Sequence, residues 1–339
     1  MTPPERRSAR ALQLIIGLAI TAALVWWAFR TVNFADVWAT IQTARVVPMV
    51  LAVIVATMPF ALRIPRWKHL LRDDQGGELP TAPLWHATAI GFAANNVLPF
   101  RAGEVIRVAA VSRLARVSFA SALSSVAVER VVDALTVVTL LGVGLVAAQL
   151  PADVHIGNGP PIAKLAQGVG LVCLAALMIA IGAAWQRAFA LRILDRMLPS
   201  GRIGEAIVHF VDRLLSGLSA LGDFRRAIPV IGWSIVIWLV NAAGFYLAFK
   251  AFSFPVPFAG ALVLQGVLMM GIAAPSTPGY ALVFEAAIVG SLALYGIPTG
   301  QAFAYALLYH ISTFIPITAL GALSAIRTGV HLKVPPATP

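Results

Sequence analysis

Eight long hydrophobic stretches follow one another along the chain, and they constrain its fold more than any other feature. They cover residues 11–29, 46–64, 84–100, 119–150, 162–185, 228–249, 258–275 with a continuation to 297, and 302–326. A helix needs about 20 apolar residues to cross the hydrocarbon layer of a bilayer, and most of these stretches approach or exceed that length. Hydrophobic residues make up 59% of the chain and charged residues only 12%, too few to cover a soluble protein. The sequence therefore predicts an all-α polytopic membrane protein, with residues 1–339 forming one integral membrane domain.

The basic residues between these stretches predict the topology. Arginine and lysine gather in residues 1–10, 63–83, 101–116 and 186–227, which the positive-inside rule places in the cytoplasm. Residues 84–100 then begin and end on the same side, so we expect a re-entrant hairpin with an irregular tip. The stretch 11–29 lacks a small-residue cleavage site, which favours a retained first span over a signal peptide. We expect a multi-pass protein of the bacterial inner membrane with both termini in the cytoplasm.

A second broken stretch lies 180 residues after the first. The stretch 258–297 is interrupted by Pro275, Pro278 and Gly279, and the charge pattern places its hairpin on the opposite side of the membrane. Interrupted segments at matching positions are typical of inverted repeats that bind substrate near the midplane. We predict six full spans and two re-entrant hairpins in two repeats, about 10–150 and 160–328, joined by a cytoplasmic amphipathic connector at 186–227. A chance resemblance of two proline-bearing segments is the alternative.

The first candidate site is the tip of the first hairpin. Asn95 and Asn96 lie deep in an apolar stretch, and Arg101, Glu104 and Arg107 follow within one short segment. Arg101 and Glu104 are spaced to pair on a helix, and helix termini here would offer backbone N–H groups to an anion. The alternative is a cytoplasmic loop with ordinary positive charges.

The second candidate site lies inside the stretch 119–150, which contains Glu129, Arg130 and Asp133. An unpaired charge at the centre of a membrane costs about 2.5–3.5 kcal/mol, so these groups should face the interior and pair. Glu129 and Asp133 share one helix face. They would hold an arginine that binds phosphate, or form a purely structural ion pair.

The third candidate site is the broken stretch itself, with Pro275, Ser276 and Gly279, followed by Glu285. The break frees backbone groups for a ligand, and a lone carboxylate in a long uncharged stretch indicates function. Pairing of Glu285 with Arg130 or Arg101 is the structural alternative. His310 falls near the repeat equivalent of Glu129, where it is either a packed polar group or a proton relay.

Several kinds of chemistry lack their signatures. The single cysteine, Cys173, excludes a disulfide within the chain, and no glycine-rich phosphate loop, metal-ligand cluster or nucleophile elbow occurs. The net charge of +11 is spread over the connections rather than over one face. The sequence therefore predicts no cofactor, no metal, no ATP drive and no nucleic-acid partner.

Three motifs in order give the chain a recognisable resemblance. N-x-x-P-x-R-x-G-E-x-x-R runs from Asn96 to Arg107, E-R-x-x-D follows at residues 129–133, and P-x-x-P-G-x₅-E runs from Pro275 to Glu285. Over residues 10–328 the chain resembles the lysylphosphatidylglycerol synthase transmembrane, or flippase-like, family, although that family often has more glycine where this chain has Tyr280. We expect a standalone member without the soluble aminoacyltransferase domain.

The resemblance implies a lipid flippase-like transporter. Such members move aminoacylated phosphatidylglycerol between leaflets or are associated with hopanoid or isoprenoid-linked glycan pathways. The expected partners are thus membrane lipids, whether an anionic or aminoacylated phospholipid or a polyprenyl- or hopanoid-linked lipid, and oligomer formation stays open. A membrane enzyme that transfers a sugar or acyl group on a lipid carrier, and a non-catalytic scaffold of a lipid pathway, are the alternatives. The expected substrate-binding residues are Asn95, Asn96, Arg101, Glu104, Arg107, Glu129, Arg130, Asp133, Pro275, Ser276, Gly279, Glu285 and His310.

Overall fold

A computed structural model of the chain describes residues 33–73, 76–98, 102–115, 117–150, 161–185, 192, 224–273 and 278–330. Within these residues it contains ten α-helices and one short 3-10 helix, without a named β-strand. The all-α prediction is confirmed. The predicted first span at 11–29 and nearly all of the predicted connector at 186–227 lie outside the described residues.

The helices follow the hydrophobic stretches closely. They are α2 (Phe34–Thr43), α3 (Val46–Leu70), α4 (Thr81–Val97), α5 (Gly103–Leu114), α6 (Phe119–Val146), α7 (Ile162–Trp185), α10 (Phe224–Ala251), α11 (Phe258–Ala273), η1 (Pro278–Tyr280), α12 (Val283–Ala293) and α13 (Thr299–Thr328). Three of the described helices are long and apolar enough to cross a membrane, namely α3, α13 and residues Ala227–Ala251 of α10. Helix α3 exposes Val50 and Ile54, whereas the interior buries Arg66 and Glu129 completely. An apolar exterior around a charged interior is the arrangement that a lipid solvent requires.

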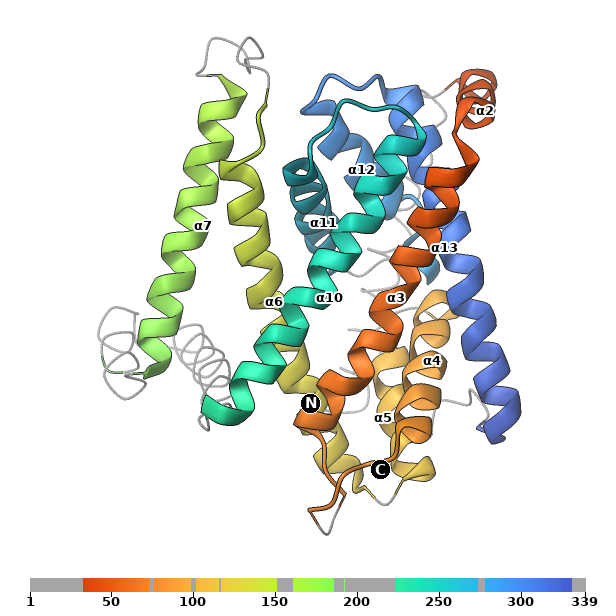
Figure 1. Cartoon of the computed structure of the whole chain (residues 1–339), viewed down its shortest axis with the longest axis vertical. Helices are drawn as coiled ribbons and strands as arrows, with labels where there is room; N and C mark the ends of the chain where they lie inside the picture. Colours follow the sequence, from red (N-terminus) through yellow and green to blue (C-terminus); the bar gives the residue numbers. More distant parts are fainter. Residues whose placement is uncertain are drawn as a thin grey trace, which may run out of the picture.

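Helices α4 and α5 form the first hairpin. Figure 1 shows them side by side at the end of the molecule where α3 finishes and α6 begins, here called the first-hairpin end. The two limbs approach closely because glycine faces glycine: a Cβ atom on Gly103 would lie 1.9 Å from the carbonyl oxygen of Gly91. The hairpin is longer than predicted. Helix α4 has 17 residues and forms only the first limb, although the hydrophobic stretch 84–100 was expected to contain both limbs. Residues 103–114, expected as a cytoplasmic connection, are the returning limb.

Helix α3 also continues further than predicted. The sequence placed residues 63–83 in a cytoplasmic connection, but α3 runs on to Leu70, and Arg63 and Arg66 are buried within the bundle. Only residues 71–80 connect α3 to α4. The prediction was wrong because a count of basic residues does not distinguish a solvated arginine from one that buried carboxylates neutralise.

Helices α11 and α12 form the second hairpin, which begins and ends where α10 finishes and α13 begins, the second-hairpin end (Figure 1). The predicted break is present as η1. Gly279, Tyr280 and Leu282 have φ angles of 65°, 58° and 67°, which turns the chain through left-handed backbone. Pro275 and Ser276 lie outside the described residues. The two hairpins thus enter from opposite ends, as the charge pattern predicted.

The two halves pack across each other. Helix α3 packs along α10, α4 along α13, and α6 along α11, while α5 contacts α6 and α12 contacts α13. Exchanging α3 with α10, the first hairpin with the second, and α6 with α13 reproduces the same set of neighbours, as an inverted repeat requires. The repeat boundaries at about 10–150 and 160–328 stay a prediction.

Close contacts hold the first hairpin against α13 of the opposite half. A Cβ atom on Gly321 of α13 would lie 2.2 Å from the Cβ atom of Ala93 on α4, so only glycine permits this approach. Near the tip of the first hairpin, the Asn96 side-chain amide donates a hydrogen bond of 2.8 Å to the Thr318 hydroxyl. Interfaces built on small residues are typical of helix packing in membranes.

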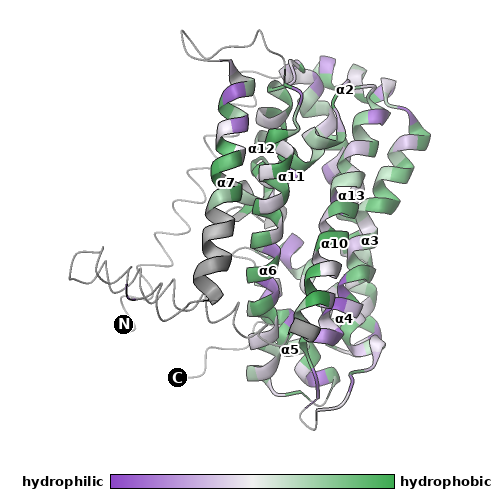
Figure 2. Cartoon of the chain, turned by 60° about the vertical axis from the view of Figure 1, so that its left-hand side comes forward, coloured by the Kyte–Doolittle hydropathy of each residue, from purple (hydrophilic) through white to green (hydrophobic). Residues whose placement is uncertain are grey.

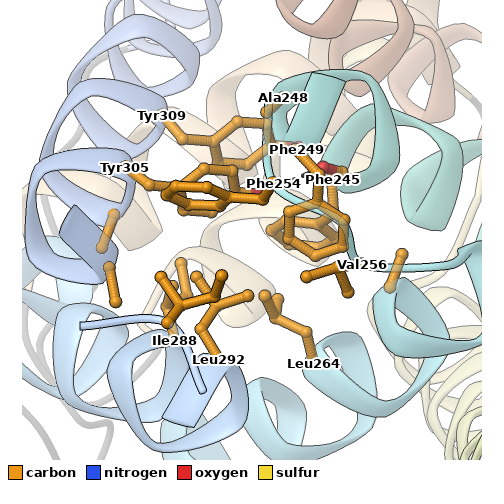
Figure 3. Close-up of a cluster of buried hydrophobic side chains, with 14 of the residues drawn as sticks. Phe245, Ala248, Phe249, Phe254, Val256, Leu264, Ile288, Leu292, Tyr305 and Tyr309 are labelled. Carbon is orange, nitrogen blue, oxygen red and sulfur yellow. Dashed lines mark hydrogen bonds between the residues drawn. The ribbon is translucent and has the colours of Figure 1, made fainter. Parts of the chain in front are cut away.

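The larger apolar core lies in the second half. Figure 3 shows Phe245 and Phe249 of α10 gathered with Tyr305 and Tyr309 of α13, while Ile288 and Leu292 lie on the neighbouring α12. The rings of Tyr305 and Tyr309 stack at 5.9 Å with an interplanar angle of 2°. A second core fills the first hairpin and includes Trp67, Leu84, Ile90, Ile106 and Val111.

Candidate functional site

Charged side chains from three helices of the first half meet inside the bundle. Glu129 and Asp133 project from one face of α6, since residues four apart share a helix face. Figure 2 shows hydrophilic positions along α6 within otherwise hydrophobic helices. The arginine cluster, as we call this group, consists of Arg63 and Arg66 of α3, Arg107 of α5, and Glu129, Arg130 and Asp133 of α6.

Glu129 is at the centre of the arginine cluster and is fully buried. Arg107 donates to both of its carboxylate oxygens, at 2.8 and 3.2 Å. Arg63 and Arg66 lie 3.3 and 3.1 Å from Oε1, and Arg130 donates to the same atom. The guanidinium of Arg107 also stacks on the ring of Trp67, 3.7 Å from its centroid, which fixes its orientation.

Asp133 ties the arginine cluster to the second half of the chain. It accepts hydrogen bonds from Arg66 and Arg63 and lies 3.1 Å from Arg130. The indole N–H of Trp238 on α10 donates to Asp133 at 2.9 Å, and Arg66 donates to the Ser234 hydroxyl at 2.9 Å. One carboxylate therefore connects α3, α6 and α10.

The arginine cluster carries more positive charge than its carboxylates balance. Counted over the described residues, its four arginines face Glu129, Asp133 and, 3.6 Å from Arg130, Glu104, so that +4 and −3 leave a net charge of +1. The Nε–H groups of Arg66, Arg107 and Arg130 are buried, and they have no hydrogen-bond partner among the residues that the structure describes. Buried donors normally have partners, so the cluster is not fully neutralised or satisfied by its own carboxylates, and an anion would be a favourable neighbour.

A cavity of about 190 Å³ opens beside the arginine cluster, between the two halves. Its walls come from α3, α4, α5 and α6 of the first half and from α10, α11 and η1 of the second. The lining residues are Pro59, Arg63, Gly91, Phe92, Asn95, Asn96, Gly103, Glu104, Arg107, Arg130, Ile237, Trp238, Asn241, Met269, Ile272 and Tyr280. Three guanidinium groups and the carboxylate of Glu104 provide the charged part of this wall, and amides, Tyr280 and apolar side chains occupy the rest.

A smaller polar group lies in the second half. The carboxylate of Glu285 on α12 is 2.7 Å from the imidazole Nδ1 of His310 on α13. Its other oxygen accepts a 2.6 Å hydrogen bond from the backbone N–H of Leu282, just after η1. Phe284 stacks on the imidazole at 4.1 Å. Glu285 therefore pairs with His310, rather than with the Arg130 considered from the sequence.

The structure brings most of the predicted site residues together. Asn95, Asn96, Glu104, Arg107 and Arg130 line the cavity, and Glu129 and Asp133 lie directly behind it. Gly279 packs close to this wall, because a Cβ atom there would lie 3.3 Å from the carbonyl oxygen of Asn96. Glu285 and His310 form the separate pair next to η1. Arg101, Pro275 and Ser276 lie outside the described residues.

Sequence reasoning missed Arg63, Arg66 and Trp238. A signal for the two arginines was available: they are three residues apart at the end of an apolar stretch, while Glu129 and Asp133 needed partners. Trp238 lacked such a signal, because an indole on an apolar helix is as typical of the lipid interface as of a hydrogen-bonded core.

Comparison with known proteins identifies the family. Residues 14–321 match the family described as the lysylphosphatidylglycerol synthase TM region. The chain is 25% identical over 332 residues to the protein named Glycosyltransferase AglD of Haloferax volcanii, which aligns 90% of this chain with 52% of that protein. It thus spans about half the length of that relative.

Two further relatives are named UPF0104 membrane protein, both from Methanothermobacter thermautotrophicus. They are 25% identical over 328 and 270 residues, covering 90% and 79% of this chain and 89% and 68% of theirs. The family match confirms the resemblance drawn from the three motifs. This chain belongs to the lysylphosphatidylglycerol synthase TM region family of multi-pass integral membrane proteins.

Proposed function

We propose that this protein moves a lipid with a phosphate-bearing head group between the two leaflets, and that the cavity beside the arginine cluster holds the head group during the passage. The observation that carries this proposal is that three guanidinium groups of a positively charged cluster line a cavity between two opposed hairpins. Guanidinium groups bind phosphate oxygens through paired, charge-assisted hydrogen bonds.

The charge of the site favours an anionic ligand. A net charge of +1 inside a low-dielectric bundle is costly, and a phosphate diester with one negative charge would balance it. Arg63, Arg107 and Arg130 line the cavity, while Arg66 supports them from behind. Ile237, Met269 and Ile272 provide apolar wall on which the start of a lipid chain would pack. Both phospholipids and polyprenyl- or hopanoid-linked lipids satisfy these requirements.

The position of the cavity supports transport between leaflets. Asn95 and Asn96 come from a hairpin that enters from one end, and Tyr280 comes from the hairpin that enters from the other. Small movements of one hairpin against the other would open the cavity toward either end, as in transporters built from inverted repeats. We place the first-hairpin end in the cytoplasm, since Lys68, Arg113 and Arg327 lie at the ends of α3, α5 and α13 there, and Arg72 lies in the connection that follows α3.

A second candidate function is transfer of a sugar or acyl group on a lipid carrier, which the name of the relative from Haloferax volcanii favours. Such an enzyme needs a carboxylate that is free to act as a base. Glu129 is in contact with four arginines and Asp133 with three, which stabilises both as permanent anions. Product formed from a lipid-linked donor by the purified protein, and lost in Glu129→Gln, would favour the enzyme.

The test of transport is a leaflet-accessibility assay in proteoliposomes with a fluorescent anionic lipid. We expect lipid to cross faster than in protein-free liposomes, and we expect Arg107→Gln to lose most of this rate. Arg113→Gln is the matched control, because Arg113 lies on the same helix but is exposed. If none of a panel of anionic lipids crossed faster than in empty liposomes, or if Arg107→Gln kept the full rate, the proposal would fail. A scaffold would instead show reduced folded yield of the variant with no lipid movement in either protein.

A further inference from the structure

The Glu285–His310 pair takes no part in the proposed binding of phosphate. Its side chains are nearly buried, with 6% and 15% of their surface exposed. Aromatic rings surround it: Phe284 stacks on the imidazole, Phe314 meets it edge-on at 6.2 Å, and Tyr309 stacks on Phe284. An acid and an imidazole in direct contact within an apolar environment can exchange and retain a proton.

The pair also holds a strained turn that belongs to the cavity wall. Tyr280 and Leu282 are not glycine, yet both have left-handed φ angles, and each such residue costs about 1 kcal/mol or more. The Leu282 N–H donates to the Glu285 carboxylate at 2.6 Å, which stabilises this conformation. Tyr280 lines the cavity, so the carboxylate links the pair to the lipid-binding wall.

One proton changes the charge of the pair. With a neutral imidazole and a carboxylate, the net charge is −1. One added proton gives either imidazolium with carboxylate or imidazole with carboxylic acid, and both have a net charge of zero. In one form the carboxyl group is uncharged, and in the other the charge of the carboxylate is partly neutralised by the neighbouring imidazolium. In both forms its hydrogen bond from Leu282 weakens, because charged acceptors bind N–H groups more strongly.

We infer that Glu285 and His310 form a proton-binding site, and that arrival of one proton releases the turn at η1 and so moves Tyr280 in the cavity wall. The inference rests on the proposed function only where it couples this step to lipid movement. Proton binding and release at this pair would then drive the opening of the cavity toward the second-hairpin end, or determine when it opens.

The helices that form the second hairpin contribute no other ionisable group besides Glu285. Glu285 is the sole ionisable side chain of α12, and α11 has none. The guanidinium groups of α3 are committed to Glu129 and Asp133. Further ionisable residues on the elements that pack around the pair are Asp36 on α2, Lys68 and His69 on α3, His86 on α4, Arg225, Arg226, Tyr246 and Lys250 on α10, Tyr280 on η1, and Tyr305, Tyr309 and Arg327 on α13. Asp36 is exposed, and Lys250 lies over the ring of Tyr246.

The first test uses the protein alone in lipid nanodiscs, without any transported lipid. Cys173→Ala removes the single cysteine, and Ile272→Cys places a thiol on the cavity wall beside η1. We expect the rate of thiol labelling, corrected for thiolate content with a free-thiol standard, to rise several-fold as the pH falls from about 8 to 5, the range over which histidine changes charge. Glu285→Gln and His310→Gln should abolish this pH dependence. Their matched controls, Glu78→Gln and His69→Gln, alter exposed residues at the first-hairpin end and should keep it.

The second test applies a pH gradient across proteoliposomes that contain a fluorescent anionic lipid. We expect the gradient to accelerate lipid movement in the wild type and not in Glu285→Gln, while lipid movement without a gradient persists in both. Labelling that is independent of pH in the parent, or equally dependent on pH in Glu285→Gln, would overturn the proton site. If labelling responds as expected but no lipid moves, the proton site stands and the proposed transport function fails.

Discussion

The two halves place ionisable groups at corresponding positions but use them differently. In the first half, Glu104 of α5 lies 3.6 Å from Arg130 of α6, as one edge of an extended network of permanent charges. In the second half, Glu285 of α12 meets His310 of α13 as an isolated pair. Arginine keeps its charge at any physiological pH, whereas histidine does not. The same scaffold thus offers a fixed anion-binding wall on one side and a group that can change charge on the other.

The halves also differ in how their hairpins are closed. In the first hairpin, backbone meets backbone through Gly91 and Gly103. In the second, the turn depends on left-handed residues and on one hydrogen bond to Glu285. The first hairpin is therefore fixed by packing, and the second by a bond whose strength depends on charge.

The largest expected difference between the halves concerns the loss of one carboxylate charge. We expect Asp133→Asn to lower the free energy of unfolding by about 3–5 kcal/mol, because it leaves Arg63 and Arg66 buried with half their partners. Glu285→Gln leaves no buried charge unpaired and only weakens the hydrogen bond from Leu282, so it should cost about 1 kcal/mol. Denaturant unfolding of both variants in the same detergent measures the two values. Equal losses would remove the energetic distinction between the halves.

A smaller difference is expected for the glycines at repeat-equivalent positions. A Cβ atom on Gly91 would lie 2.6 Å from the Cβ atom of Arg107, whereas one on Gly271 would meet Val283 at an ordinary 3.5 Å. We expect Gly91→Ala to cost about 1–3 kcal/mol through overpacking and Gly271→Ala to be tolerated. Thermal unfolding of the two variants provides the comparison. A tolerated Gly91→Ala would mean that the first hairpin is less tightly closed than its backbone contact indicates.

The smallest expected effect concerns the hydrogen bond that joins the halves. Asn96→Ala and Thr318→Val should each cost about 1 kcal/mol, the usual contribution of a neutral hydrogen bond. In a double-mutant cycle the combined loss should be smaller than the sum of the two, because both changes remove the same bond. Strict additivity would show that the bond contributes nothing to holding α4 against α13.

Much of the fold follows from the sequence alone. The apolar stretches predicted the helices. The prolines and the glycine near residue 279 predicted the second break, because backbone geometry limits where these residues fit. The ends of α3 and the extent of the first hairpin did not follow. Both errors came from counting Arg63, Arg66 and Arg107 as solvated, although they neutralise carboxylates on another helix.

The candidate site was predictable in its residue types and less so in its partners. Glu129, Arg130 and Asp133 stood out because charges inside an apolar stretch are costly. Their main partners are distant in the sequence: Asp133 and Trp238 are 105 residues apart. Such contacts depend on which helices become neighbours, and the pattern of one helix does not contain that information.

The crossed packing of the halves has a consequence for biosynthesis. The hydrogen bond between Asn96 and Thr318 cannot form until the ribosome has synthesised Thr318, 222 residues after Asn96. At about 5–20 residues per second, a ribosome needs roughly 10–45 s to supply that partner. During this interval the face of α4 that will receive Gly321 stays uncovered. We expect the half-made protein to depend on a membrane insertase or on lipid to cover that face until the last helix arrives.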